Sequence, residues 1–130
     1  MNFAQLEQKI IQSYVEGVTM DQAERLAGEF LSAQLQVSEE LKKFDLDSRM
    51  RKAGLKAVRS SVYLEIIKTN EKKPTEAQIA AIVDTDATVQ EEQKAFDEAE
   101  VERDNLKRYF DVFNQAHVHF RSIAKGSFNG

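Results

Sequence analysis

The feature that most constrains this chain is an unbroken heptad pattern over about its last forty residues, Thr85 to Gly126. From Phe96 onward, one series of positions steps by three and four residues, a spacing that keeps one side of a helix facing a partner helix. About forty helical residues make a rod of roughly 60 Å, so this stripe needs another long helix or a second copy of the chain to cover it. The series comprises Phe96, Ala99, Arg103, Leu106, Phe110, Phe113, His117, Phe120 and Ala124.

Six members of this series form the predicted oligomer or core stripe, and one further member is charged. A charged residue such as Arg103 on a helix seam often sets register and finds a carboxylate. We interpret His117 as a packed histidine of a core or interface, because His119 points about 200° away from it on a helix and the two cannot share a metal ion. The predicted stripe residues are Phe96, Leu106, Phe110, Phe113, His117 and Phe120.

Composition favours an all-α chain. One proline and five glycines in 130 residues leave few turn signals, which favours a few long helices over a β-fold. The length suits a single domain, and 42% apolar with 31% charged residues fits a globular protein better than a disordered tail or a membrane protein. No apolar run approaches the ~18 residues that span a bilayer, and the N-terminus does not resemble a signal peptide. We therefore expect no membrane partner and a cytoplasmic location, in a host cell if a phage encodes the chain.

Polar residues divide the first part of the chain. Residues 1–44 are expected to form N-terminal helices, the first over 2–15 and the second from the capping box Thr19–Gln22. Asp and Ser in residues 45–48 favour helix caps over helix interiors. This segment therefore predicts either a kink or a break, and the pattern does not choose between them.

Residues 45–126 are expected to form a long antiparallel helical hairpin. Helix 49–69 faces the start of helix 86–125, and a short helix between them begins at the capping box Thr75–Gln78. Residues 127–130 are expected to be a frayed tail. The fold class is thus all-α and coiled-coil-like, within a single domain.

Helix 49–69 carries two apolar stripes, and one hairpin partner cannot bury both. We therefore expect the chain to form a homo-oligomer, although the pattern does not give its copy number. One stripe comprises Met50, Ala53, Ala57, Ser61 and Leu64, and the other comprises Leu55, Val58, Val62 and Ile66.

The net charge of −4 conceals a basic segment, because residues 42–83 carry a net charge of +5 and residues 84–105 carry −7. A basic surface on an acidic chain still attracts phosphate. Alternatively, these cations pair with the carboxylates of residues 91–104, and both interpretations remain open. Four of the candidates follow i, i+3, i+7 and i+10 and so line one helix face. The candidate DNA-binding residues are Arg49, Arg51, Lys52, Lys56 and Arg59.

Catalysis by a familiar constellation is not expected. The chain has no cysteine, no glycine-rich phosphate loop, and neither a Gly-x-Ser-x-Gly nor a His-Glu-x-x-His motif. The carboxylates of residues 91–104 lack a patterned histidine and fit a solvated face. We therefore predict no catalytic residues, no metal site and no cofactor.

Two segments carry a resemblance to a known family. The first is Arg51-Lys52-Ala53-Gly54-Leu55-Lys56-Ala57, followed by Arg59 and Tyr63. The second is the break Val83-Asp84-Thr85-Asp86, with a long helix that ends in Phe120-Arg121-Ser122-Ile123-Ala124-Lys125. In this order they resemble phage recombination mediators of the UvsY type, over about residues 41–126.

The resemblance implies an all-helical protomer that assembles into a ring and binds single-stranded DNA. It also implies contacts with a single-strand binding protein and help in loading a RecA-type recombinase. By position, Lys56 and Arg59 would contact DNA, with Arg51 and Lys52 beside them. An alternative from another class is a helical structural or adaptor protein of a phage virion or host-interaction complex, with no nucleic-acid binding. A small-molecule sponge at oligomer interfaces is a third possibility, and an enzyme is the last.

Overall fold

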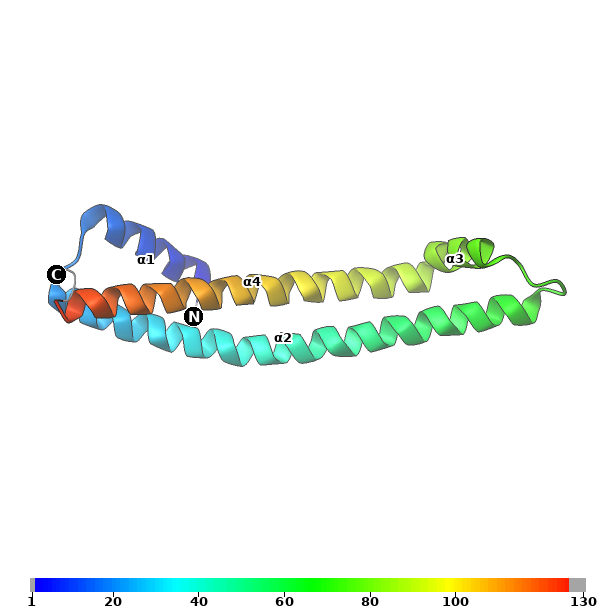
Figure 1. Ribbon diagram of the computed structural model, residues 1–130, viewed down its shortest axis with the longest axis horizontal. Helices are drawn as coiled ribbons and strands as arrows, with labels where there is room; N and C mark the ends of the chain where they lie inside the picture. Colours follow the sequence, from blue (N-terminus) through cyan, green and yellow to red (C-terminus); the bar gives the residue numbers. More distant parts are fainter. Residues whose placement is uncertain (1, 127–130) are drawn as a thin grey trace. The chain divides into compact units, whose positions relative to one another are not determined.

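The computed structural model describes residues 2–126, and every regular element in that range is an α-helix. The long helices α2 and α4 pack against each other as an antiparallel hairpin (Figure 1). The all-α class and the hairpin are therefore confirmed, whereas the predicted tail 127–130 lies outside the described residues. The helices are α1 (Phe3–Glu16), α2 (Met20–Thr69), α3 (Glu76–Thr85) and α4 (Ala87–Ala124).

Both predicted capping boxes start helices. The Gln22 backbone amide donates to the Thr19 hydroxyl at 3.2 Å, and the Thr19 amide donates to the Gln22 side-chain oxygen at 2.9 Å. Thr75 and Gln78 repeat these two bonds at the same distances. Each box satisfies amides that the first turn of a helix leaves without partners. Helices α2 and α3 therefore begin where the sequence predicts.

Glycine ends α1 and follows α4. Gly17 has φ +76° and Gly126 has φ +68°, in the left-handed region that glycine enters without a Cβ clash. The Gly17 amide donates to the Ser13 carbonyl at 2.9 Å, which closes the last turn of α1.

Helix α2 continues through residues 45–48, so of the two outcomes predicted for this segment, a kink or a break, the break does not occur. The reason is visible in the side chains of two of these residues. Asp45 and Asp47 lie 3.2 and 3.1 Å from the guanidinium groups of Arg49 and Arg51, one helical turn further on. Acid-to-base pairs at this spacing stabilise a helix, so residues that favour caps elsewhere are accommodated inside this one.

The chain forms two compact units, and α2 and α4 contribute to both. One unit combines the described residues up to Lys42 with those from Asp104 onward, and the other is Lys43–Arg103. The predicted division between residues 44 and 45 therefore does not coincide with a helix end, although a unit boundary lies close to it.

The unit that contains α1 has an aromatic core. The side chains of Phe30, Phe113 and Phe120 are at most 1% exposed. The Phe113 ring lies 5.8 Å from the rings of Phe3 and Phe30, and the Phe30 ring stacks at 5.7 Å on Phe120. Ring pairs at these distances stabilise beyond the burial of their area. This core therefore joins α1, α2 and α4.

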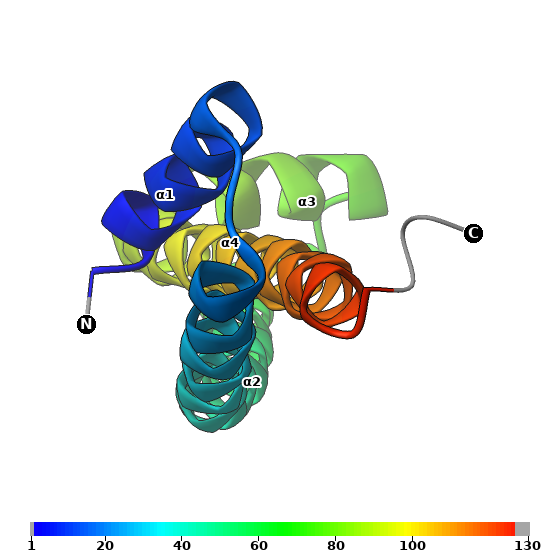
Figure 2. The same ribbon diagram turned by 90° about the vertical axis from the view of Figure 1, so that its left-hand side faces the viewer.

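Two ion pairs hold α1 against its neighbours. Lys9 lies 2.6 Å from Glu29 on α2, and Glu7 lies 2.6 Å from Arg108 on α4. The hydrogen bond to Glu7 raises the pKa of the Arg108 guanidinium above its ordinary value. Figure 2 views this unit from the end at which α2 begins.

The unit Lys43–Arg103 has an aliphatic core in which α3 packs with α2 and α4. Val58, Val62, Tyr63 and Phe96 pack around it half-buried. The predicted pairing of helix 49–69 with the start of the last helix is therefore confirmed within this unit. The buried members are Leu55, Ile66, Ile79, Val83 and Val89.

In the described part of the chain, no helix is both long enough and apolar enough to cross a membrane.

Phe113→Ala is expected to lower the free energy of unfolding by about 3–5 kcal/mol, because it leaves a cavity among three aromatic rings. Val118→Ala on the same helix is the control, since Val118 is 54% exposed and should change stability by less than about 0.5 kcal/mol. Urea denaturation followed by circular dichroism measures both. Equal unfolding midpoints for the two variants would contradict the assigned core.

Candidate nucleic-acid interface

The basic face of α2 consists of Arg49, Lys52, Lys56 and Arg59. Helix geometry places them along one side, because they recur at i, i+3, i+7 and i+10. Arg49, Lys52 and Lys56 are exposed and Arg59 is half-buried. The residues that enter the core of this unit lie on a different side of the same helix. The structure therefore keeps these four cations at the surface.

The two arginines of the basic face already have carboxylate partners. Arg49 lies 3.2 Å from Asp45, and Arg59 lies 2.8 Å from Asp84 at the end of α3. Neither carboxylate belongs to residues 91–104, which the internal-pairing alternative names as partners. Both pairs are largely exposed, and such pairs are worth only about 0.2–1 kcal/mol. A phosphate can therefore compete for either guanidinium at modest cost.

The two lysines of the basic face differ from the arginines. Within the described residues, neither Lys52 nor Lys56 has a carboxylate close enough for an ion pair. They are four residues apart, so their Cβ atoms lie about one helical turn from each other on the same side. An exposed ammonium group is a point charge with three rotatable donors, which suits phosphate oxygens. Lys52 and Lys56 can therefore bind an anion without first giving up a carboxylate partner.

Arg51 does not belong to the basic face. Consecutive helix residues are rotated by about 100°, so Arg51 projects away from Lys52, and its guanidinium lies 3.1 Å from Asp47. Of the five predicted DNA-binding residues, the structure thus brings four onto one side and leaves Arg51 on another.

Asp84 is a site residue that is not among the predicted DNA-binding residues. It lies close before α4, as Asp86 does, and the first turn of that helix requires an N-cap. In the structure the cap is Asp86, whose Oδ1 accepts a hydrogen bond from the Val89 amide at 3.0 Å. Asp84 accepts a hydrogen bond from Arg59 instead. A pair 25 residues apart in different helices leaves no periodic signal in a sequence.

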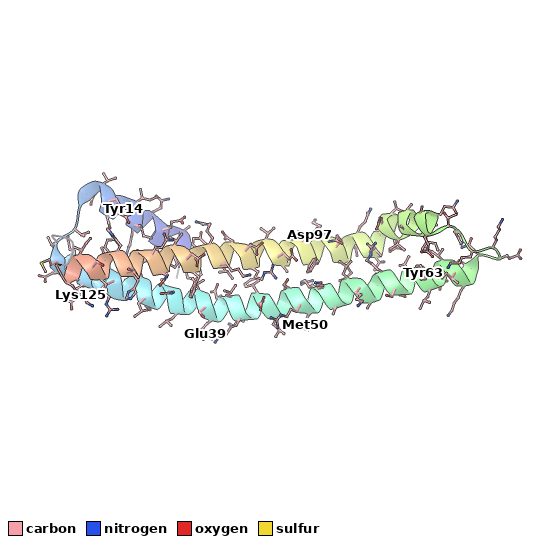
Figure 3. The ribbon with its side chains drawn as sticks, viewed as in Figure 1. Tyr14, Glu39, Met50, Tyr63, Asp97 and Lys125 are labelled. Atoms are coloured by element: carbon pink, nitrogen blue, oxygen red, sulfur yellow. The ribbon has the colours of Figure 1, made fainter. Side chains whose placement is uncertain are left out.

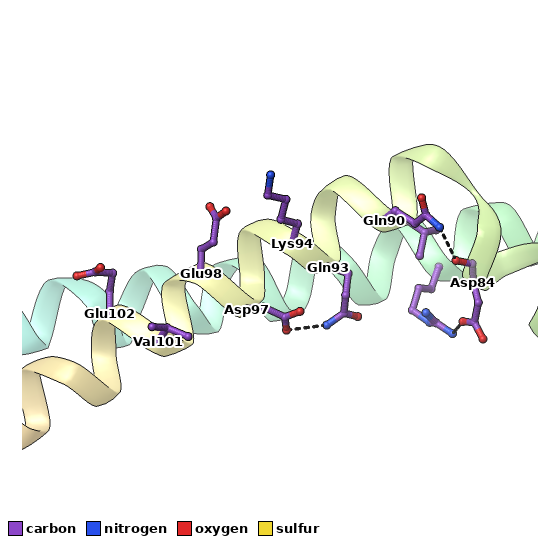
Figure 4. A pocket seen from close by; sticks show the side chains of 10 residues that line it. Asp84, Gln90, Gln93, Lys94, Asp97, Glu98, Val101 and Glu102 are labelled. Carbon is purple, nitrogen blue, oxygen red and sulfur yellow. Dashed lines mark hydrogen bonds and ion pairs between the residues drawn. The ribbon is translucent and has the colours of Figure 1, made fainter.

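A groove runs beside Arg59 along the outer side of α4 (Figure 4). Four carboxylates and two cations line it together with Val89, Val101 and two glutamines. The excess of carboxylates repels phosphate, so this groove is unsuited to a nucleic-acid contact. The charged lining residues are Arg59, Asp84, Lys94, Asp97, Glu98 and Glu102.

The predicted oligomer or core stripe on α4 packs within the chain. Leu106, Phe113 and Phe120 are at most 5% exposed, and Phe96 and Phe110 are half-buried. The three buried members have no surface left for a second copy. Leu106, Phe113 and Phe120 are therefore core residues of the chain itself.

His117 also has a structural role. Its ring is half-buried, and Nδ1 lies 2.9 Å from the Ala27 carbonyl oxygen. Because a carbonyl only accepts, Nδ1 carries the proton in this bond. Among the described residues, no group of three histidine, aspartate or glutamate side chains is arranged to hold a metal ion.

Comparison with known proteins gave no match: no protein-family model, curated protein or solved structure matches this chain.

Replacing Lys52 and Lys56 together with alanine is expected to change the free energy of unfolding by less than about 0.5 kcal/mol. Neither side chain enters a core or an ion pair among the described residues, and such surface substitutions are usually close to neutral. Urea denaturation checks this. A loss above 2 kcal/mol would show that the lysines have structural contacts, and the basic face would then not be a free surface.

Proposed function

We propose that this chain is a non-catalytic protein that binds single-stranded DNA through the basic face of α2 and serves as a recombination mediator. The observation that carries the proposal is the pair Lys52 and Lys56. Both are exposed on one side of a helix, and neither has an ion-pair partner among the described residues. Their neighbours Arg49 and Arg59 supply two further cations at the same helical spacing.

The expected contacts are to phosphates. Proteins that bind single strands without sequence preference usually combine a basic track with aromatic side chains that stack on bases. Here Tyr63 is the aromatic residue near the basic face, and it is half-buried against the core of its unit. Binding should therefore show little sequence preference and a strong dependence on salt.

The four cations are not expected to contribute equally. The lysines meet a phosphate without first losing a protein partner, whereas Arg49 and Arg59 must exchange a carboxylate for it. Asp84 also adds its own negative charge next to Arg59. Lys52 and Lys56 should therefore dominate the affinity, with Arg49 and Arg59 as secondary contacts.

The mediator role rests on the resemblance to phage recombination mediators of the UvsY type. Those proteins bind single-stranded DNA, contact a single-strand binding protein and help load a RecA-type recombinase. A single basic face on a chain of net charge −4 makes a weak site. Several copies on one strand would offset this weakness by avidity, which fits a protein that organises a filament.

A second candidate is a helical adaptor or structural protein that binds no nucleic acid. The observation that favours it is the apolar stripe of α2 that contains Met50 and Leu64, because Met50 is 66% exposed and Leu64 is 56% exposed. Such a stripe suits a protein partner. Recovery of a defined protein partner, together with no DNA binding at low salt, would favour this function over the first.

Changing Lys52 and Lys56 to alanine is expected to weaken binding to labelled oligo-dT in a fluorescence anisotropy titration. Each phosphate contact to a single strand contributes about −0.7 to the slope of log K against log salt, so the slope should flatten by about 1.4. Lys107→Ala with Lys125→Ala is the matched control, because it removes the same charge from two exposed positions, one on α4 and one directly after its end. No binding by the unmodified chain at 50 mM salt, or equal losses in both variants, would overturn the proposal.

Asp84→Asn is expected to strengthen binding to the same oligonucleotide. The substitution frees Arg59 and removes a carboxylate beside it, so the salt slope should steepen by about 0.7 if Arg59 gains one phosphate contact. Asp111→Asn removes one exposed carboxylate elsewhere on α4 and controls for net charge. If both variants gained affinity equally, Arg59 would not be a contact.

A further inference from the structure

The outer side of α2 in the unit Lys43–Arg103 carries a second heptad series. It steps by three, four, three, four and three residues, which is the spacing of a coiled-coil seam. Its members are exposed except for Ile67, which is half-buried. Figure 3 labels Met50, whose side chain extends from α2 on the side away from α4. The outer seam comprises Met50, Ala53, Ala57, Ser60, Leu64 and Ile67.

This outer seam is separate from the core. Leu55 and Val62 lie on the opposite side of the same helix and pack in the core of the unit. A helix with a sustained apolar heptad on its exposed side has the pattern that a second helix covers. Leu46, which is 60% exposed four residues before Met50, extends the pattern by one step.

We propose that the outer seam pairs with the outer seam of a second copy of this chain, with the two α2 helices antiparallel. In this register Met50 packs against Ile67 of the second copy, Ala53 against Leu64, and Ala57 against Ser60. Reversing the series sets the small Ala53 opposite the large Leu64, so in these layers the series complements its own reverse. Three distinct layers, each made twice about a two-fold axis, form the seam.

Side-chain size favours the antiparallel arrangement over a parallel one. A parallel pair places identical residues opposite each other, which stacks three layers of Ala53, Ala57 and Ser60 with nothing to fill the space beside them. The antiparallel register sets Leu64 opposite Ala53, so only the two central layers are small. Layers of more even volume pack with fewer voids, and voids are costly in a seam.

Charge also favours this register. Asp47 and Lys68 flank the seam on the same side of α2, and antiparallel pairing brings Asp47 of each copy beside Lys68 of the other. Lys56 faces Tyr63 of the second copy on the other flank. Sliding the helices by one heptad would set Lys56 opposite Lys56 of the second copy, and like charges at such flanking positions oppose pairing. The proposed register therefore gains an opposite-charge pair on one flank and avoids the like-charge pair that the shifted register has on the other.

Analytical ultracentrifugation of the whole chain tests the association, which is expected whether or not the chain binds DNA. We expect a mass above that of one chain at 10–100 µM, and we expect Ala57→Glu to weaken association about tenfold or more, because it places two carboxylates in the middle of the seam. Ala77→Glu, at an exposed position of α3, is the matched control. A single-chain mass at 100 µM, or equal behaviour of the two variants, would overturn the proposal.

Disulfide trapping tests the register, because the chain has no cysteine of its own. Met50→Cys mixed with Ile67→Cys is expected to form a mixed disulfide dimer under mild oxidation, identified by mass spectrometry. Met50→Cys alone should form none, since the two copies of residue 50 lie about 25 Å apart along the antiparallel pair, beyond disulfide reach. A Met50→Cys homodimer, or the absence of the mixed dimer, would overturn the antiparallel seam even if one charge variant failed to fold.

Discussion

The burial of the apolar side of α4 against α2 is the interaction on which the rest of the structure depends. Neither long helix is stabilised by propensity alone, because most helical stability in proteins comes from packing of an apolar face. In one unit this packing is aromatic and recruits α1 through Phe3, while in the other it is aliphatic and recruits α3 through Ile79. The short helices thus complete two cores that the long helices begin.

This packing also decides which charges stay at the surface. The core takes one side of α2, and the basic face occupies a neighbouring side where no apolar contact competes. The aspartates at positions 45 and 47 neutralise arginines one turn further along the same helix, which leaves the lysines as the cations with the greatest freedom to bind an anion. At Arg59 the basic face of α2 borders the acidic groove, where phosphate binding is unfavourable. The proposed DNA site is therefore narrow and lies on a single helix.

Much of the fold could be predicted from the sequence, because its signals are local. Both threonine-glutamine capping boxes start helices, at α2 and α3, and glycines with positive φ follow α1 and α4. The stripe through Leu106, Phe113 and Phe120 is buried as its heptad spacing indicates. Of the kink or break predicted at residues 45–48, the break does not occur. Asp45 and Asp47 favour caps in isolation but pair with arginines four residues later, and helix propensity takes no account of that pairing.

The site was less predictable for a different reason. Helical spacing was enough to place Arg49, Lys52, Lys56 and Arg59 on one side of α2. It did not predict that Arg59 has Asp84 as its partner, because this contact joins two helices that the local pattern treats separately. Arg51 was included for its charge and for its place in the segment that carries the resemblance, although its position in the helix turns it away from the others. Local periodicity therefore predicts which residues share a face, and only the tertiary structure shows which of them are already neutralised.

Helix α2 has three sides with different contacts: the core side, the basic face and the outer seam. Such a helix tolerates insertion and deletion poorly. Adding one residue near the middle of α2 would rotate every later side chain by about 100° and would move core, cationic and outer apolar positions out of phase together. An insertion of seven residues is close to two full helical turns, so it would leave all three sides of α2 facing nearly the same directions. Residues 70–75 form a turn, where an insertion rotates no helix side. In proteins of this design, natural insertions and deletions should therefore occur in the turn of residues 70–75 more often than within α2.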